Sequence, residues 1–165
     1  MSTEQERLFV GFFKPNQKLI HKICKIYTDN AEDHEDLFQE ITIQLWKSFP
    51  GFKGEAKFST WMYRVALNTA ITLFRKPQKK QGQPVELDIG SLKIEHEEYV
   101  DDEHQLKRMY NAIYELSDVE KALIMMYLED KPYKEIREIL GITEGNARVK
   151  MNRAKNNLKT KISTI

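Results

Sequence analysis

The chain has 165 residues, of which 41% are hydrophobic and 31% charged, with a mean hydropathy of −0.59. This composition suffices for one packed domain or two small ones and argues against disorder throughout the chain. No apolar stretch approaches the roughly 20 residues of a membrane-spanning helix, and Glu4 and Glu6 stand where a signal peptide would carry basic residues, so we expect a cytoplasmic protein without membrane insertion.

The net charge of +1 conceals an uneven distribution along the chain. Residues 1–80 hold 13 Lys and Arg against 9 Asp and Glu, residues 81–105 hold 1 against 8, and residues 106–165 hold 12 against 8. Two basic halves flanking an acidic segment predict two modules that face one polyanion, with a linker that avoids or imitates it. Ordinary charge scatter is the alternative interpretation.

Helical spacing of apolar residues dominates the first half of the chain, and no stretch alternates with a period of two. Helices are predicted over residues 8–13, 19–27, 33–47 and 59–75. Pro15 separates the first two, which we expect to be antiparallel. Pro50 and Pro77 end the third and fourth.

Residues 77–101 show no lasting apolar period and are predicted to be a linker. Beyond it, residues 106–116 return to helical spacing, and Ser117 with Glu120 predicts a capping box for the next helix. Pro132 opens a short helix, and a turn at Gly141 leads into a last helix over 144–161. The sequence therefore predicts an all-α fold of two small helical domains, residues 1–76 and 102–165, joined by the acidic linker.

The last two predicted helices resemble a helix-turn-helix. On the last one, Ala147, Met151, Ala154 and Leu158 share one face. The other side carries side chains suited to phosphates and base edges, namely Asn146, Arg148, Val149, Asn152, Arg153 and Asn156. From Gly145 onward there are six basic residues and no acidic ones. The pattern predicts a helix that enters a DNA major groove, with a solvated basic helix of a bundle as the alternative.

The third predicted helix places an isoleucine on a polar face. Leu37, Phe38, Ile41 and Leu45 point one way. The opposite face carries Asp36, Gln39, Glu40, Ile43 and Lys47. An isoleucine surrounded by polar residues is typical of the centre of a protein-binding patch, although a lone exposed isoleucine can also be without function.

The fourth predicted helix and the loop before it combine cations with aromatic rings. Lys53 and Lys57 alternate with aromatic residues in the loop, and a stripe of Arg64, Asn68, Ile71 and Arg75 runs along the helix. Rings that stack on bases beside cations that meet phosphates are typical of single-strand binding. Taken alone, such aromatic residues more often form core than a stacking platform, and we expect Trp61 to be core.

No set of residues points to catalysis, so we expect no catalytic residues, no metal and no cofactor. His21 and Cys24 lack a second ligand pair, and there is no phosphate-binding glycine loop. The acidic residues Glu32, Glu35, Asp36 and Glu40 could hold magnesium, as in some helical hydrolases. Helix capping and partner docking explain them more simply.

Three segments together resemble regions 2 and 4 of extracytoplasmic-function (ECF) sigma factors. They are DHEDLFQEITIQLW, FPGFKGEAKFSTWMYRVALNTA and LSDVEKALIMMYLEDKPYKEIREILGITEGNARVKMNRAKNNL, in the family's order and spacing. The resemblance implies a non-enzymatic subunit that directs RNA polymerase to promoters. A free-standing helix-turn-helix regulator and a helical metal-dependent hydrolase are the other hypotheses, in that order.

The resemblance also implies roles and partners. The polar face with Ile43 matches the surface that docks on the clamp helices of the polymerase's largest subunit, and the second module meets the flap of the other large subunit. The minus-ten element, as single strand, is matched to Lys53, Lys57, Arg64, Asn68 and Arg75. The minus-thirty-five element, as duplex, is matched to the polar face of the last helix. An anti-sigma factor is a further expected partner, and the acidic linker is expected to follow basic channels of the polymerase.

Overall fold

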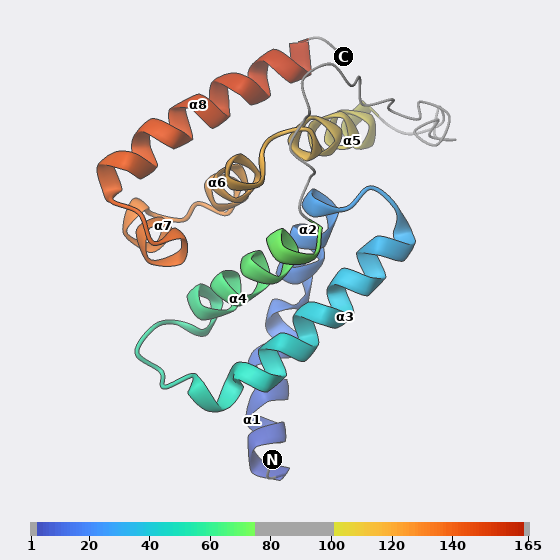
Figure 1. Ribbon diagram of the computed structural model, residues 1–165. Coiled ribbons are helices and arrows are strands. Elements are labelled where there is room, and N and C mark those ends of the chain that lie inside the picture. Colours follow the sequence, from blue (N-terminus) through green and yellow to red (C-terminus); the bar gives the residue numbers. More distant parts are fainter. Residues whose placement is uncertain (1–2, 75–100, 164–165) are drawn as a thin grey trace.

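The computed structural model describes residues 3–74 and 101–163, with side chains from residue 104 onward in the second range (Figure 1). These residues form eight α-helices and two short 3-10 turns and contain no strand, which confirms the predicted all-α class. The α-helices are α1 (Thr3–Phe13), α2 (Gln17–Tyr27), α3 (Ala31–Ser48), α4 (Phe58–Leu73), α5 (Asp101–Tyr114), α6 (Asp118–Leu128), α7 (Tyr133–Leu140) and α8 (Glu144–Ser163), and the 3-10 turns are η1 (Lys14–Asn16) and η2 (Phe49–Gly51). Arg75 and nearly all of the predicted linker lie outside the described residues.

The first two helices are not antiparallel, contrary to the prediction. The backbone stays helical at Phe13 (φ −70°, ψ −48°) and again at Gln17 (φ −59°, ψ −41°), so α2 continues onward from α1 (Figure 1). Pro15 sits inside the 3-10 turn between them, near its start, where a backbone N–H has no helical partner to lose. A proline there interrupts the helix without reversing the chain.

The N-terminal module packs α3 and α4 against each other and against α2. Asn30 caps α3 by accepting a 2.8 Å hydrogen bond from the Asp33 backbone N–H. The predicted inward residues Leu37, Ile41 and Leu45 are fully buried, and Phe38 is partly buried. The sequence pattern thus predicted the buried face of α3 correctly.

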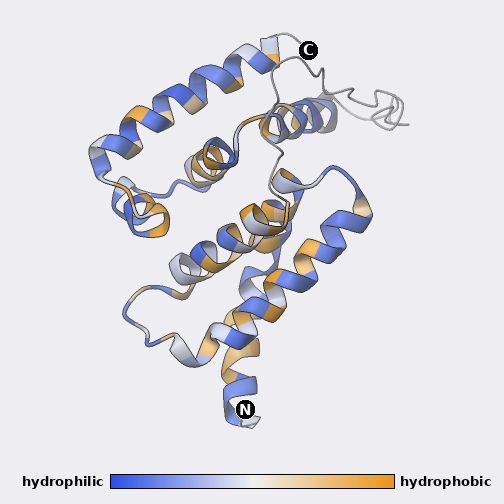
Figure 2. Ribbon diagram, viewed as in Figure 1, coloured by the Kyte–Doolittle hydropathy of each residue, from blue (hydrophilic) through white to orange (hydrophobic). Residues whose placement is uncertain are grey.

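In the C-terminal module α8 packs across α5, α6 and α7, and its outer side is largely hydrophilic (Figure 2). Gly141 joins α7 to α8 in the left-handed conformation (φ 68°), which favours glycine because it lacks a Cβ. Ala147, Met151 and Ala154 are buried, as predicted, and Leu158 is partly buried. The helix-turn-helix is therefore held by the predicted apolar face of α8.

The predicted capping box at the start of α6 is present. Ser117 accepts a hydrogen bond from the Glu120 N–H at 3.3 Å, and the Glu120 carboxylate accepts one from the Ser117 N–H at 3.2 Å. We expect Ser117→Ala to lower the free energy of unfolding by about 1 kcal/mol, because one N-terminal N–H of α6 loses its acceptor. Urea denaturation measures this difference. Ser48→Ala is the control, since Ser48 precedes η2 without a side-chain cap, and an equal loss in both variants would contradict the capping role.

The two modules pack against each other. Helix α7 lies against α4, and α5 and α6 lie against α2 (Figure 1). Buried apolar residues of both modules belong to one continuous core. The tertiary structure thus adds an interface between the predicted domains, while their boundaries at residues 76 and 102 stay predictions.

Candidate nucleic-acid interface

Helix α8 presents the predicted DNA-reading side chains to solvent. Asn146, Arg148, Val149, Asn152, Arg153 and Asn156 are all exposed. Val149 has 52% of its surface exposed, although it is apolar. The structure therefore brings all six predicted residues together on one open surface of the helix-turn-helix.

The start of α8 is held in place by polar contacts. The Thr143 hydroxyl accepts a 3.1 Å hydrogen bond from the Asn146 N–H and so caps the helix. Arg148 forms an ion pair with Glu144 at 3.3 Å, and its guanidinium lies 4.3 Å from the ring centroid of Tyr133 in α7. An exposed guanidinium oriented by a ring and a carboxylate can exchange these partners for a phosphate or a base edge.

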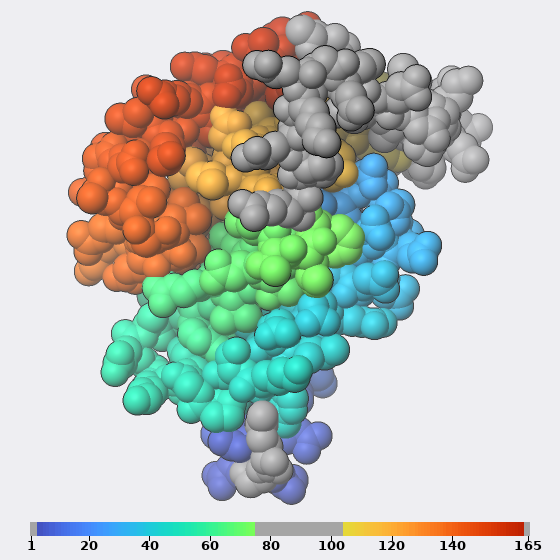
Figure 3. All heavy atoms as spheres, in the orientation of Figure 1, coloured from blue at the N-terminus to red at the C-terminus, as the bar shows by residue number. Residues whose placement is uncertain are grey.

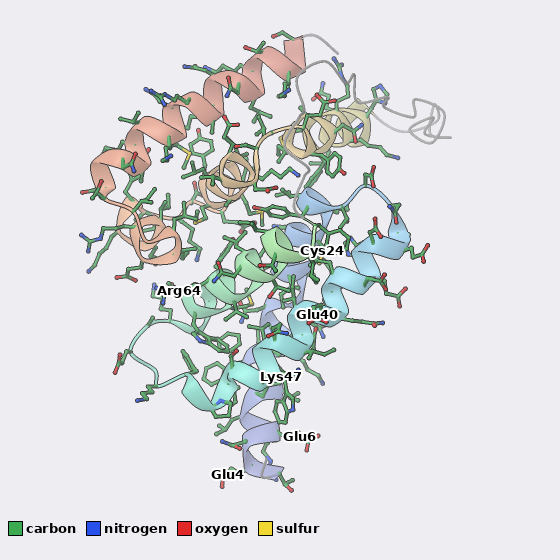
Figure 4. The ribbon with its side chains drawn as sticks, in the orientation of Figure 1. Glu4, Glu6, Cys24, Glu40, Lys47 and Arg64 are labelled. Carbon is green, nitrogen blue, oxygen red and sulfur yellow. The ribbon has the colours of Figure 1, made fainter. Side chains whose placement is uncertain are left out.

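Helix α4 carries two of the predicted single-strand residues on its exposed side. Arg64 and Asn68 are both exposed, while Tyr63 and Leu67 beside them are buried. Arg64 extends from the side of α4 that faces α7 (Figure 4), and its guanidinium donates a hydrogen bond to the carbonyl oxygen of Glu138. Lys57, in the loop before α4, is 3.7 Å from the carboxylate of Glu135 in α7. Two predicted DNA-contacting cations are thus engaged by the other module.

The aromatic rings around this loop pack mainly on one another. Phe58 stacks on Phe12 with ring centroids 4.9 Å apart, and Phe52 contacts Trp61 at 5.2 Å. Phe58 is buried, whereas Phe52 and Trp61 are partly buried. The rings form a local cluster that holds the loop, in which Lys53 is exposed and Gly54 takes a positive φ of 75°. The core interpretation of Trp61 fits this packing better than a free stacking platform does.

The polar face of α3 forms the third predicted surface. Ile43 is 44% exposed, and Asp36, Gln39 and Lys47 are exposed around it. Glu40 is partly covered and accepts a 2.9 Å hydrogen bond from the Gln44 amide. Glu40 and Lys47 lie along the outer side of α3 (Figure 4). An exposed apolar side chain that is surrounded by polar and charged residues on a helix is suited to protein docking.

No group of three or more His, Cys, Asp or Glu among the described residues could hold a metal ion. Burial raises the pKa of the Cys24 thiol to about 12. Burial is also the main cause that lowers the pKa of His34, and Nε2 of the His34 ring lies 2.9 Å from Nδ1 of His21. None of the described helices is long and apolar enough to cross a membrane.

Sequence reasoning missed the residues that join the two modules. Lys22 and Glu129 form an ion pair at 2.8 Å, and this hydrogen bond raises the pKa of Lys22. The Tyr27 hydroxyl donates to the Asp118 carbonyl oxygen at 2.8 Å. Partners separated by some 90 to 110 positions leave no periodic signal in a single sequence, so no pattern could have indicated these pairs.

The fold and the exposed basic helix define a helix-turn-helix protein of two helical modules, a class that binds DNA through its second motif helix. Family models match two parts of the chain, "Sigma-70 region 2" over residues 12–80 and "Sigma-70, region 4" over residues 106–158. A curated relative, the ECF RNA polymerase sigma-E factor of Haemophilus influenzae, is 27% identical over 82% of this chain and 78% of its own length. The ECF RNA polymerase sigma-E factor of Escherichia coli strain K12 is also 27% identical, over 88% of this chain and 83% of its own length.

Two solved structures have the same fold. The sigma factor RpoE in complex with the anti-sigma factor NepR from Bartonella quintana superposes with a TM-score of 0.69, at 19% identity over 92% of this chain and 94% of that chain. CnrH in complex with the cytosolic domain of CnrY gives a TM-score of 0.69, at 15% identity over 96% of this chain and 90% of that chain. The chain belongs to the ECF group of the sigma-70 family. It is an RNA polymerase sigma factor, which acts in promoter recognition and transcription initiation.

Proposed function

We propose that this sigma factor works through three separate surfaces, each with its own partner. The α3 face around Ile43 docks on the clamp helices of core polymerase. Lys53, Lys57, Arg64, Asn68 and Arg75 capture the minus-ten single strand, and the exposed face of α8 reads the minus-thirty-five duplex. The observation that carries the proposal is the C-terminal helix-turn-helix, whose last helix has only one acidic residue, Glu144, and exposes Arg148, Asn152 and Arg153 together.

The two nucleic-acid surfaces differ in the form of DNA they suit. Arg153 and Asn152 project from a long exposed helix, which fits the major groove of duplex DNA. Asn68 and Arg64 lie on α4 beside the loop, and an amide there pairs with a base edge only once the base has left the stack. We therefore assign duplex recognition to the second module and strand capture to the first.

We further infer that the protein is not an enzyme and acts in the cytoplasm, where RNA polymerase transcribes. An anti-sigma factor is a proposed third partner, since the related sigma factor RpoE was solved with the anti-sigma factor NepR. The flap of the second-largest polymerase subunit is proposed to meet the second module. These partners follow from family membership rather than from a bound molecule.

Co-purification followed by transcription tests the proposal. We expect the tagged full chain to bring down core polymerase subunits from a bacterial lysate and to direct run-off transcription from a subset of a promoter library. A chain that forms a homodimer and binds duplex DNA without polymerase would instead support a free-standing helix-turn-helix regulator. Transcription by core polymerase that is independent of the added chain would contradict the sigma function.

A further inference from the structure

Arg148, on the exposed face of α8, is held by two neighbours that come from different helices of the helix-turn-helix. Its guanidinium carbon lies 4.3 Å from the ring centroid of Tyr133, the first residue of α7, and its Nη2 donates to the carboxylate of Glu144 at 3.3 Å. The Arg148 side chain still keeps 60% of its surface exposed. The guanidinium is therefore oriented by the protein and accessible to DNA at the same time.

The Tyr133 ring is itself fixed by the fold. It is partly buried and packs against the hydrophobic core, and it follows Pro132, whose φ of −69° leads the chain into α7. Helices α7 and α8 pack on each other, and their atoms adjoin at the left of the view in Figure 3. A ring held in this way is a fixed support for an arginine on the neighbouring helix.

The contact with Tyr133 leaves the donor groups of Arg148 available. Arg148 lies over the face of the ring. An arginine that stacks on an aromatic face keeps its N–H groups directed outward in the guanidinium plane, where they match the O6 and N7 acceptors of guanine. Binding to a base edge therefore requires Arg148 to exchange the Glu144 carboxylate but not the Tyr133 ring.

Glu144 influences the same guanidinium through its charge. It is the only acidic residue of α8, it lies one turn before Arg148, and 54% of its side chain is exposed. Its charge offsets that of Arg148 and repels DNA phosphates, whereas a carboxylate can accept a hydrogen bond from N4 of cytosine. The pair of Glu144 and Arg148 is therefore better suited to the edge of a base pair than to the DNA backbone.

A second cation of α8 also lies over a ring and supplies a matched control. The Lys155 ammonium is 3.9 Å from the ring centroid of Tyr127 in α6. Lys155 follows Arg148 by seven residues, so it lies two turns further along nearly the same face. An ammonium has no planar fork, so it can attract a phosphate but cannot bind guanine through two parallel hydrogen bonds. The two contacts thus differ in the ability to read a base.

We propose that Tyr133 is a positioning residue for promoter recognition, whose ring holds Arg148 in the orientation that reads a guanine of the minus-thirty-five duplex, while Glu144 keeps Arg148 from binding a phosphate instead. The inference rests on the proposed assignment of duplex recognition to α8. It adds a residue of α7, which acts through Arg148, to the residues of α8 predicted to contact DNA. Both helices of the motif therefore set the preference at one base pair.

The test measures binding of the holoenzyme to the minus-thirty-five duplex of a promoter found by run-off transcription. 7-Deazaguanine replaces each guanine of either strand in turn, because it lacks the N7 acceptor and still pairs with cytosine. The guanine read by Arg148 is the one at which this replacement weakens binding by wild type but not by Arg148→Ala. The other variants are Tyr133→Leu, Tyr133→Phe, Glu144→Gln and the control Tyr127→Leu.

We expect wild type to bind the duplex with guanine at this position about tenfold more tightly than the duplex with 7-deazaguanine. Tyr133→Leu should lower this ratio by about two- to fivefold, which corresponds to the loss of an exposed ring–cation contact. Tyr133→Phe keeps the ring and should retain the wild-type ratio, as should Tyr127→Leu. Glu144→Gln should lower the ratio while it tightens binding to duplexes of any sequence, because it removes a charge that repels phosphates.

Combined substitutions separate positioning from a general effect on the fold. If the ring acts through Arg148, Tyr133→Leu has no further effect on duplex binding in an Arg148→Ala protein. Arg153→Ala should weaken binding by the same factor in the Tyr133→Leu protein as in wild type, because α8 still enters the groove. A disturbed helix-turn-helix would change both results.

The inference is overturned if no guanine distinguishes wild type from Arg148→Ala, or if Tyr133→Leu keeps the wild-type ratio. It is also overturned if Tyr133→Phe loses as much as Tyr133→Leu, which would assign the effect to the hydroxyl, or if Tyr133→Leu weakens binding equally with and without Arg148. A failure of the proposed function is distinguishable, because Arg148→Ala and Arg153→Ala would then both bind the duplex as wild type does.

Discussion

Replacing Ile43 with arginine is expected to weaken binding to core polymerase by about 2 kcal/mol, roughly thirtyfold in affinity, without unfolding the first module. Ile43 is 44% exposed on α3, so a longer polar side chain meets water rather than core. In a docked complex the same position would be the apolar centre of the contact, where arginine brings a charge that must be desolvated. Titration of labelled sigma factor with core polymerase measures the effect.

The control for this substitution is Leu8→Arg in the same module. Leu8 is 52% exposed on α1, a different helix from the one that carries Ile43, so its replacement adds the same charge on another element. We expect Leu8→Arg to bind core polymerase as wild type does. Unchanged affinity of a folded Ile43→Arg protein, with helical content verified by circular dichroism, would remove the α3 face from the docking surface.

Two substitutions are expected to separate duplex reading from strand capture. Arg153→Ala should weaken holoenzyme binding to a minus-thirty-five duplex by about 1–3 kcal/mol, if its exposed guanidinium contacts a base edge. Asn68→Ala should spare that duplex and weaken binding to a minus-ten single strand instead, because its amide meets a base only after the base is unstacked. Each holoenzyme is measured against both DNA fragments.

Controls on the same helices separate base contacts from general effects. Lys159→Ala removes an exposed cation further along α8, and we expect it to weaken specific and non-specific duplexes alike, with a shallower dependence on salt. Thr72→Ala, one turn beyond Asn68 on α4, should leave strand binding unchanged. If Arg153→Ala and Asn68→Ala both weaken binding to the same DNA fragment and leave binding to the other unchanged, then the assignment of duplex recognition to the second module and strand capture to the first is wrong.

Helix positions and their buried faces could be predicted because they depend on short-range spacing. The period of 3.6 residues placed Leu37, Ile41 and Leu45 on one side of α3, and each is fully buried. Ser117 and Glu120 form their capping box within one turn, so the local sequence was sufficient. The path of the chain at Pro15 was predicted wrongly, since proline fixes only its own φ and removes one N–H, neither of which requires a reversal.

The sequence by itself determined the all-α class, the family and the exposed face of α8, because each depends on spacing within one helix or on motifs in a fixed order. Only the tertiary structure decided that α7 lies on α4 and that Arg64 and Lys57 are occupied by the second module. Arg64 and Glu138 are 74 positions apart, and their contact depends on how the surfaces of the two modules meet. Neither helical period nor charge pattern encodes that meeting, because both describe neighbours along one helix.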